Sequence, residues 1–128
     1  MAVMVGEIEG SNTFTLTSVI VEGESFTTTV EGEAEGFGYV HGTHKFVPTL
    51  PDRSAGTITA HFDLVTNEGD FVLGHTMGIY SRSNNIINVK TLDLLPDGTQ
   101  ALVTGTMDLV KREFSWDLRF ITDYASGD

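Results

Sequence analysis

Two segments of alternating hydrophobicity, joined by a polar turn at residues 67–70, lie between Gly56 and Tyr80. One face of the first segment carries Ile58, Ala60, Phe62 and Leu64, and one face of the second carries Phe71, Leu73, His75, Met77 and Ile79. Alternation with a period of two is typical of a β-strand that buries one face. The stretch therefore predicts a β-hairpin, and we expect both rows to face a core.

Similar segments fill most of the remaining chain, at residues 13–22, 25–36, 37–47, 86–95, 101–110 and 114–121. None has the 3.6-residue period of an amphipathic helix. Strands joined by short turns favour an antiparallel meander, and about eight of them can close into a barrel without edges. We therefore expect an all-β chain: residues 1–128 form a single antiparallel up-and-down β-barrel, with a turn at 10–12 and a flexible tail at 123–128. A two-sheet β-sandwich is the alternative.

The composition excludes several kinds of site and partner. No cysteine is present, which excludes disulfides, thiolate metal sites and cysteine nucleophiles. The net charge of −11 disfavours nucleic acid and anionic membranes as partners. No apolar run approaches the ~20 residues that span a bilayer, and the amino terminus has no signal-peptide pattern. We expect a cytoplasmic protein with neither a membrane nor a nucleic-acid partner.

Small residues line one face of the segment at 25–36. Gly32, Ala34 and Gly36 share that face, and Gly105 has a similar place in a later strand. Small side chains on a strand permit close packing of another backbone, strong coiling, or space for a ligand. We expect them to leave a cavity. The opposite face carries Glu31, Glu33 and Glu35, which we interpret as a solvated row that discourages aggregation.

Three motifs resemble the small barrels of the allene-oxide-cyclase-like class, and within it a group of bacterial barrel proteins of unknown function. They are Val-Glu-Gly-Glu-Ala-Glu-Gly at 30–36, Gly-Asp-Phe-Val-Leu-Gly-His at 69–75 and Leu-Val-Thr-Gly-Thr-Met at 102–107. Members of the wider class include cyclases and isomerases of hydrophobic small molecules, and proteins without known activity. The resemblance implies a barrel fold with its site in the interior. No catalytic motif of the class matches this chain, so no catalytic residue is carried over.

Neither a metal site nor a cofactor site is predicted. His41 and His44 are three residues apart, so a regular strand points them to opposite faces. The chain has no Gly-x-Ser-x-Gly nucleophile motif and no phosphate-binding glycine loop. We expect no metal and no cofactor.

His75 is the one polar residue in its apolar row, so it is the candidate catalytic residue. An imidazole inside the barrel could move a proton near neutral pH, and Tyr39 is the expected catalytic partner. The alternative is a core histidine bonded to a carbonyl group or a tyrosine. The expected substrate-binding residues are apolar and are placed on inward faces: Phe26, Phe62, Met77, Met107, Trp116 and Phe120. The same residues would equally build a packed core.

These observations leave three functions open. The first is a cofactor-independent cyclase or isomerase that orients a hydrophobic small molecule inside the barrel. The second is a non-catalytic barrel that binds a small ligand. The third is a structural protein that forms a homodimer or higher homo-oligomer, with Val19, Val21, Ile121 and the glutamate row as its interface.

Overall fold

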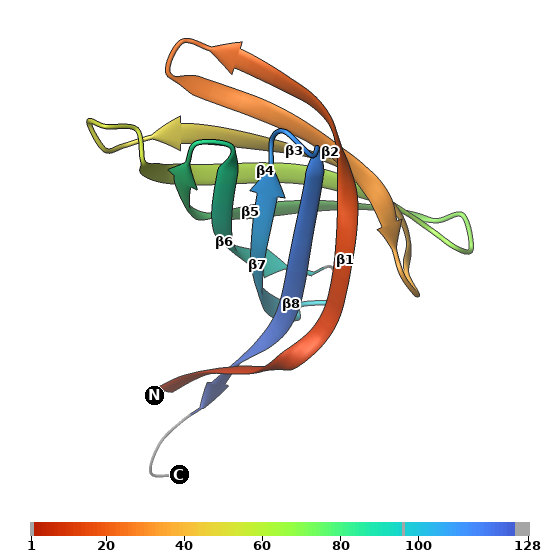
Figure 1. The fold of residues 1–128 in the computed structure, drawn as a ribbon. Helices are drawn as coiled ribbons and strands as arrows, with labels where there is room; N and C mark the ends of the chain where they lie inside the picture. Colours follow the sequence, from red (N-terminus) through yellow and green to blue (C-terminus); the bar gives the residue numbers. More distant parts are fainter. Residues whose placement is uncertain (1, 96, 125–128) are drawn as a thin grey trace.

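Eight antiparallel strands close into a barrel in the computed structural model, which describes residues 2–95 and 97–124 (Figure 1). The strands are β1 (Ala2–Glu22), β2 (Ser25–Ala34), β3 (Gly38–Pro48), β4 (Ala55–Thr66), β5 (Phe71–Ser83), β6 (Ile86–Leu94), β7 (Gln100–Asp108) and β8 (Glu113–Tyr124). Each strand pairs with the next one along the chain, and β8 pairs back with β1. The predicted all-β up-and-down barrel is confirmed, and the sandwich alternative is wrong.

Strand β1 closes the barrel because it pairs with two neighbours. Its first part pairs with β8 from Ala2 to Thr15, and its last part pairs with β2 from Thr15 to Glu22. Figure 1 shows it as the long red strand between β2 and β8. The register shifts at three places along β1, and such bulges bend a strand and increase its twist. At the shift after Leu16, the side chain of Arg112 donates hydrogen bonds to two carbonyl groups of β1.

Two local predictions about the chain ends are wrong. The turn expected at residues 10–12 is extended, because β8 supplies pairing partners there and Gly10 lies opposite Leu118. The flexible tail was expected to include residues 123 and 124, but Asp123 and Tyr124 belong to β8 and pair with β1. Residues 125–128 lie outside the described part of the chain.

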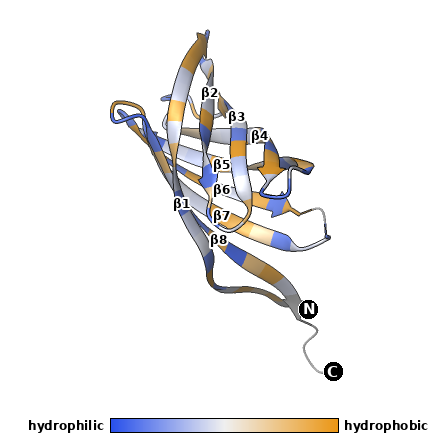
Figure 2. Cartoon of the chain, turned by 90° about the vertical axis from the view of Figure 1, so that its right-hand side faces the viewer, coloured by the Kyte–Doolittle hydropathy of each residue, from blue (hydrophilic) through white to orange (hydrophobic). Residues whose placement is uncertain are grey.

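The core fills the barrel and takes side chains from all eight strands. Phe46, Ile58, Ile87 and Met107 are fully buried. The ring of Phe26 stacks on that of Phe46 with centroids 4.6 Å apart. Figure 2 shows apolar and polar residues alternating along the strands, as expected where one face of each strand is buried.

The outer surface of the barrel carries the polar residues of most strands. Glu33 and Glu35 are exposed and Glu31 is half-buried, which confirms the solvated glutamate row. The described residues contain no helix of the length and apolarity needed to cross a bilayer.

Candidate functional site

The face that β5 turns toward the barrel is the opposite of the one expected. His75 and Met77 are exposed, together with Phe71, Leu73 and Ile79, whereas Tyr80 is buried. The prediction that His75 and Met77 face the interior is therefore wrong. A period of two defines two faces but does not say which one is buried.

Glycine contacts explain the orientation of β5. A Cβ atom added to Gly74 would lie 2.3 Å from Cζ of Phe62 on β4, and one added to Gly78 would lie 1.8 Å from the carbonyl oxygen of Lys90 on β6. Real Cβ atoms do not approach other atoms this closely. The inward face of β5 therefore has no room for side chains at these two positions, and the residues that alternate with the two glycines, Leu73 and Met77 among them, point outward.

Two of the small residues that were expected to leave a cavity, Gly32 and Gly105, are covered by aromatic rings. The ring of Phe14 fills the space beside Gly32, and the ring of Phe114 fills the space beside Gly105. An aromatic ring laid over a strand glycine supplies the packing that the glycine lacks. The expectation that these glycines leave an open cavity is therefore wrong.

The remaining expected substrate-binding residues point inward, where they lie either in the core or at the rim of the barrel. Phe26 and Met107 are buried, and Phe62 and Trp116 are half-buried. Phe120 lies opposite the buried Ala101 but is 38% exposed. These side chains form an apolar core, while their proposed role toward a substrate stays a prediction.

Tyr39 also lies outside the barrel. Its ring is exposed and makes an edge contact with that of His41, with centroids 5.2 Å apart. Partial desolvation and then the negative charge of Glu31 raise the pKa of the Tyr39 hydroxyl above its ordinary value. The prediction that Tyr39 faces the interior is therefore wrong.

Three histidines meet in an open groove of about 510 Å³ on the outer surface of β2–β5, here called the histidine groove. His61 and His75 are paired across β4 and β5, with ring centroids 4.7 Å apart. The ring of His41 lies between two carboxylates, 3.3 Å from Glu31 and 3.4 Å from Asp63. The spacing of the histidines does not predict this cluster, because their convergence depends on the register of β3, β4 and β5.

The histidine groove offers hydrogen-bonding groups and charge, but not a formed metal site. Among the described residues, no group of three or more histidine and carboxylate side chains is arranged to hold a metal ion. Imidazoles and carboxylates at its floor can bind polar groups, and Leu73 and His75 join the groove to the exposed side chains of β5.

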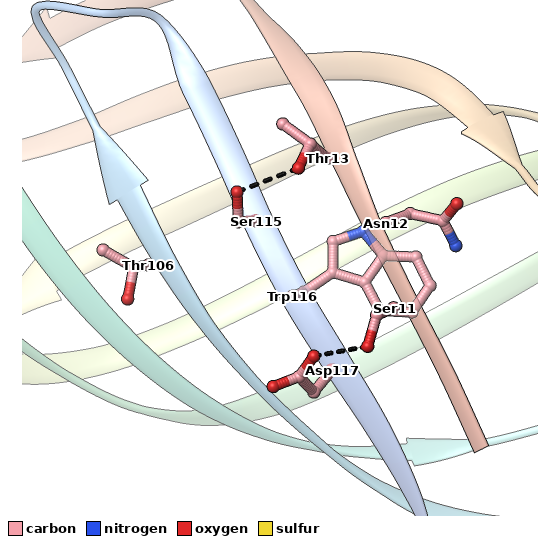
Figure 3. Close-up of a pocket in the computed structure, with 7 residues that line it drawn as sticks. All are labelled: Ser11, Asn12, Thr13, Thr106, Ser115, Trp116 and Asp117. Atoms are coloured by element: carbon pink, nitrogen blue, oxygen red, sulfur yellow. Dashed lines mark hydrogen bonds between the residues drawn. The ribbon is translucent and has the colours of Figure 1, made fainter. Parts of the chain in front are cut away.

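A second open groove, of about 360 Å³, lies over β1, β7 and β8 (Figure 3). Its polar side chains are largely paired with one another: Ser11 donates a hydrogen bond to Asp117, and the hydroxyls of Thr13 and Ser115 are 3.0 Å apart. Such cross-strand pairs stabilise the contact between β1 and β8 that closes the barrel. We interpret this groove as structural.

His44 points into the barrel and is half-buried; from the sequence it was a candidate only for a metal ligand. Its ring makes an edge contact with Phe114 at 5.2 Å, and its buried Nδ1 atom has no hydrogen-bond partner among the described residues. Burial lowers the pKa of His44 to about 4. Its alternation with the buried Gly42 and Phe46 was the available signal.

Comparison with known proteins adds no relative. No protein-family model matches this chain, and no curated protein or solved structure matches it. The resemblance to the allene-oxide-cyclase-like class stays a prediction.

Proposed function

We propose that this barrel is a non-catalytic binding protein that works through the outer surface of β5 and β6. The observation that carries the proposal is a contiguous group of large apolar side chains, 57–67% exposed, here called the outer apolar face. Its members are Phe71, Leu73, Met77 and Ile79 on β5 and Leu92 and Leu94 on β6. Single exposed apolar residues are normal, but a contiguous patch of them is typical of an interaction surface.

Strand pairing makes this face continuous. Met77 lies directly opposite Leu92 on β6, and Phe71 lies opposite Val65 on β4, which in turn lies opposite Tyr39 on β3. Side chains directly opposite one another on the same face of a sheet are in contact range. The apolar surface therefore crosses several strands rather than following one.

The shape of the face favours a macromolecular partner. Small ligands are held in concave sites that enclose most of their surface. The outer apolar face is the surface of a sheet, and the histidine groove beside it is open. We therefore expect the face to pack against the apolar surface of a second polypeptide chain, with His75 as the residue that the face shares with the histidine groove.

The cyclase or isomerase activity stays a prediction that no observation tests. The two side chains expected to carry it, His75 and Tyr39, face solvent. The aromatic rings beside Gly32, Gly74 and Gly105 occupy space that a substrate would need. Binding by the outer surface requires neither an interior cavity nor a catalytic group.

Two readouts on one variant test the proposal. Leu73→Ser/Met77→Ser removes the centre of the outer apolar face, and Val19→Ser/Val21→Ser removes exposed apolar side chains of β1 as a matched control. If the face is free, the first variant loses binding of the apolar dye anilinonaphthalene sulfonate. If the face is occupied, the first variant changes the molar mass measured by light scattering. The control should change neither, and the proposal is wrong if the first variant also changes neither.

A further inference from the structure

We propose that the partner of the outer apolar face is a second copy of this chain, an inference that rests on the binding role proposed above. Strand β5 supplies the observation that points to a copy rather than to another protein. Its outward residues have a symmetric order of polar and apolar side chains, and a symmetric surface is what a two-fold interface requires. In such an interface the same patch contributes from both subunits and must be complementary to itself.

His75 is the midpoint of the outward residues of β5. Leu73 and Met77 lie two positions to either side of it, and are unbranched at Cβ and similar in length. Phe71 and Ile79, which are both apolar but differ in size, lie four positions to either side. Read in either direction along the strand, the face therefore presents one polar ring flanked by two apolar side chains on each side.

The geometry of face-to-face packing turns this order into contacts. Two sheet faces can meet around a two-fold axis that lies in the plane of the interface. An axis that crosses the strands at His75 lays β5 of one copy antiparallel over β5 of the other. Leu73 then meets Met77 of the second copy, and each His75 meets its own equivalent.

The size of the face fits a stable dimer. Six large side chains that are each about three-fifths exposed present on the order of 600 Å² of apolar surface. With the polar side chains between them, the face reaches roughly the 800 Å² per partner of a standard interface.

Charge favours this part of the surface as the place of contact. Two chains that each carry a net charge of −11 repel each other over most approaches. From Phe71 to Ile79, however, β5 contains no Asp, Glu, Lys or Arg. The carboxylate directly opposite Leu73, that of Asp63 on β4, is half-buried and lies 3.4 Å from His41. Two acidic copies can therefore approach along β5 without placing carboxylates of that strand against each other.

Light scattering on the wild type and on two charge variants tests whether the partner is a second copy of the chain. We expect the wild-type protein to have twice the 13.9 kDa mass of the chain. Met77→Lys buries an uncompensated charge twice in a symmetric interface, so it should raise the dimer dissociation constant about 100-fold or more. Val21→Lys places the same charge on an exposed position of β1 and should leave the dimer intact.

Thiol cross-linking tests the axis. The chain has no cysteine, so each introduced thiol is the only one. Facing sheets lie about 10 Å apart, too far for a disulfide, so the cross-linker is a short bismaleimide that spans about 10 Å between thiols. With it, His75→Cys should cross-link to its own copy. The equivalent positions of Leu73 are also offset by about 13 Å along the strands, so they lie roughly 17 Å apart. Leu73→Cys and Met77→Cys should therefore cross-link poorly alone and well when mixed.

The outcomes separate this inference from the binding role. If the protein stays monomeric at concentrations up to about 1 mM, where even a weak dimer is populated, the proposed dimer is wrong. If that monomer binds the apolar dye through Leu73 and Met77, the binding role stands alone. A dimer that Met77→Lys leaves intact also overturns the inference, as does a His75→Cys variant that cross-links no better than Val21→Cys. The cysteine variants keep the test decisive if a lysine variant fails to fold.

Discussion

The ring of Phe62 on β4 lies over Gly74 on β5, so close that a Cβ atom on the glycine would sit 2.3 Å from the ring carbon Cζ. The two residues are direct partners in the sheet. This contact explains why the outward side of β5 carries the large side chains, and with them the outer apolar face.

Gly74→Ala should therefore lower the free energy of unfolding by about 1–3 kcal/mol, the usual cost of overpacking. Urea denaturation measures this change in the free energy of unfolding. Gly10→Ala is the matched control, because a Cβ atom there meets nothing within 4 Å. Adding Phe62→Leu should recover part of the loss, and a double-mutant cycle without coupling between the two sites would contradict the contact.

His44 should make the fold sensitive to acid. Its pKa is about 4 in the folded protein against 6.5 in an exposed histidine, so the unfolded chain takes up the proton first as the pH falls. The stability that depends on neutral His44 is complete above pH 6.5 and is lost as the pH drops toward 4, by about 2 kcal/mol at pH 5.

Urea unfolding at pH 7 and pH 5 tests this expectation. His44→Leu should reduce the difference in unfolding free energy between the two pH values. His61→Gln, which changes an exposed imidazole, should keep the wild-type difference. An unchanged difference in His44→Leu would show that other groups cause the acid sensitivity.

Thr28 is fully buried, and its hydroxyl has no partner among the described residues. Thr28→Val keeps the shape and removes the unpaired group, so it should raise the free energy of unfolding by about 1 kcal/mol. Thr29→Val is the control, because the Thr29 hydroxyl bonds to those of Thr17 and Ser18, and its loss should not stabilise. Thermal or urea unfolding compares the stability of the two variants with that of the wild type. A destabilised Thr28→Val would mean that a bound water satisfies the Thr28 hydroxyl.

Asp93 and Asp97 should respond oppositely to neutralisation. Burial raises the pKa of Asp93, whereas hydrogen bonds from Thr99 lower the pKa of Asp97. A raised pKa means that the charged form costs stability above it and that this cost disappears as the pH falls. At pH 7, Asp93→Asn should therefore raise the free energy of unfolding and Asp97→Asn should lower it. Equal effects of the two variants in urea unfolding at pH 7 would contradict this assignment.

The sequence by itself determined the strands and their order. Alternation with a period of two requires no knowledge of neighbours, since it reflects the geometry of a single strand with one buried face. Short turns between such strands then leave few topologies besides a meander. For β4 the prediction extended to the buried face, because Ile58 and Ala60 were both expected there and both are buried.

Only the tertiary structure decided which face of β5 is inside and where the histidines meet. Both faces of β5 contain residues that a core accepts, so the choice depends on what the neighbouring strands place there, here Phe62 and the backbone of Lys90. For the same reason His75 is outside the barrel and Tyr80 is inside. The meeting of His41, His61 and His75 depends on the register of three strands, which no local pattern contains.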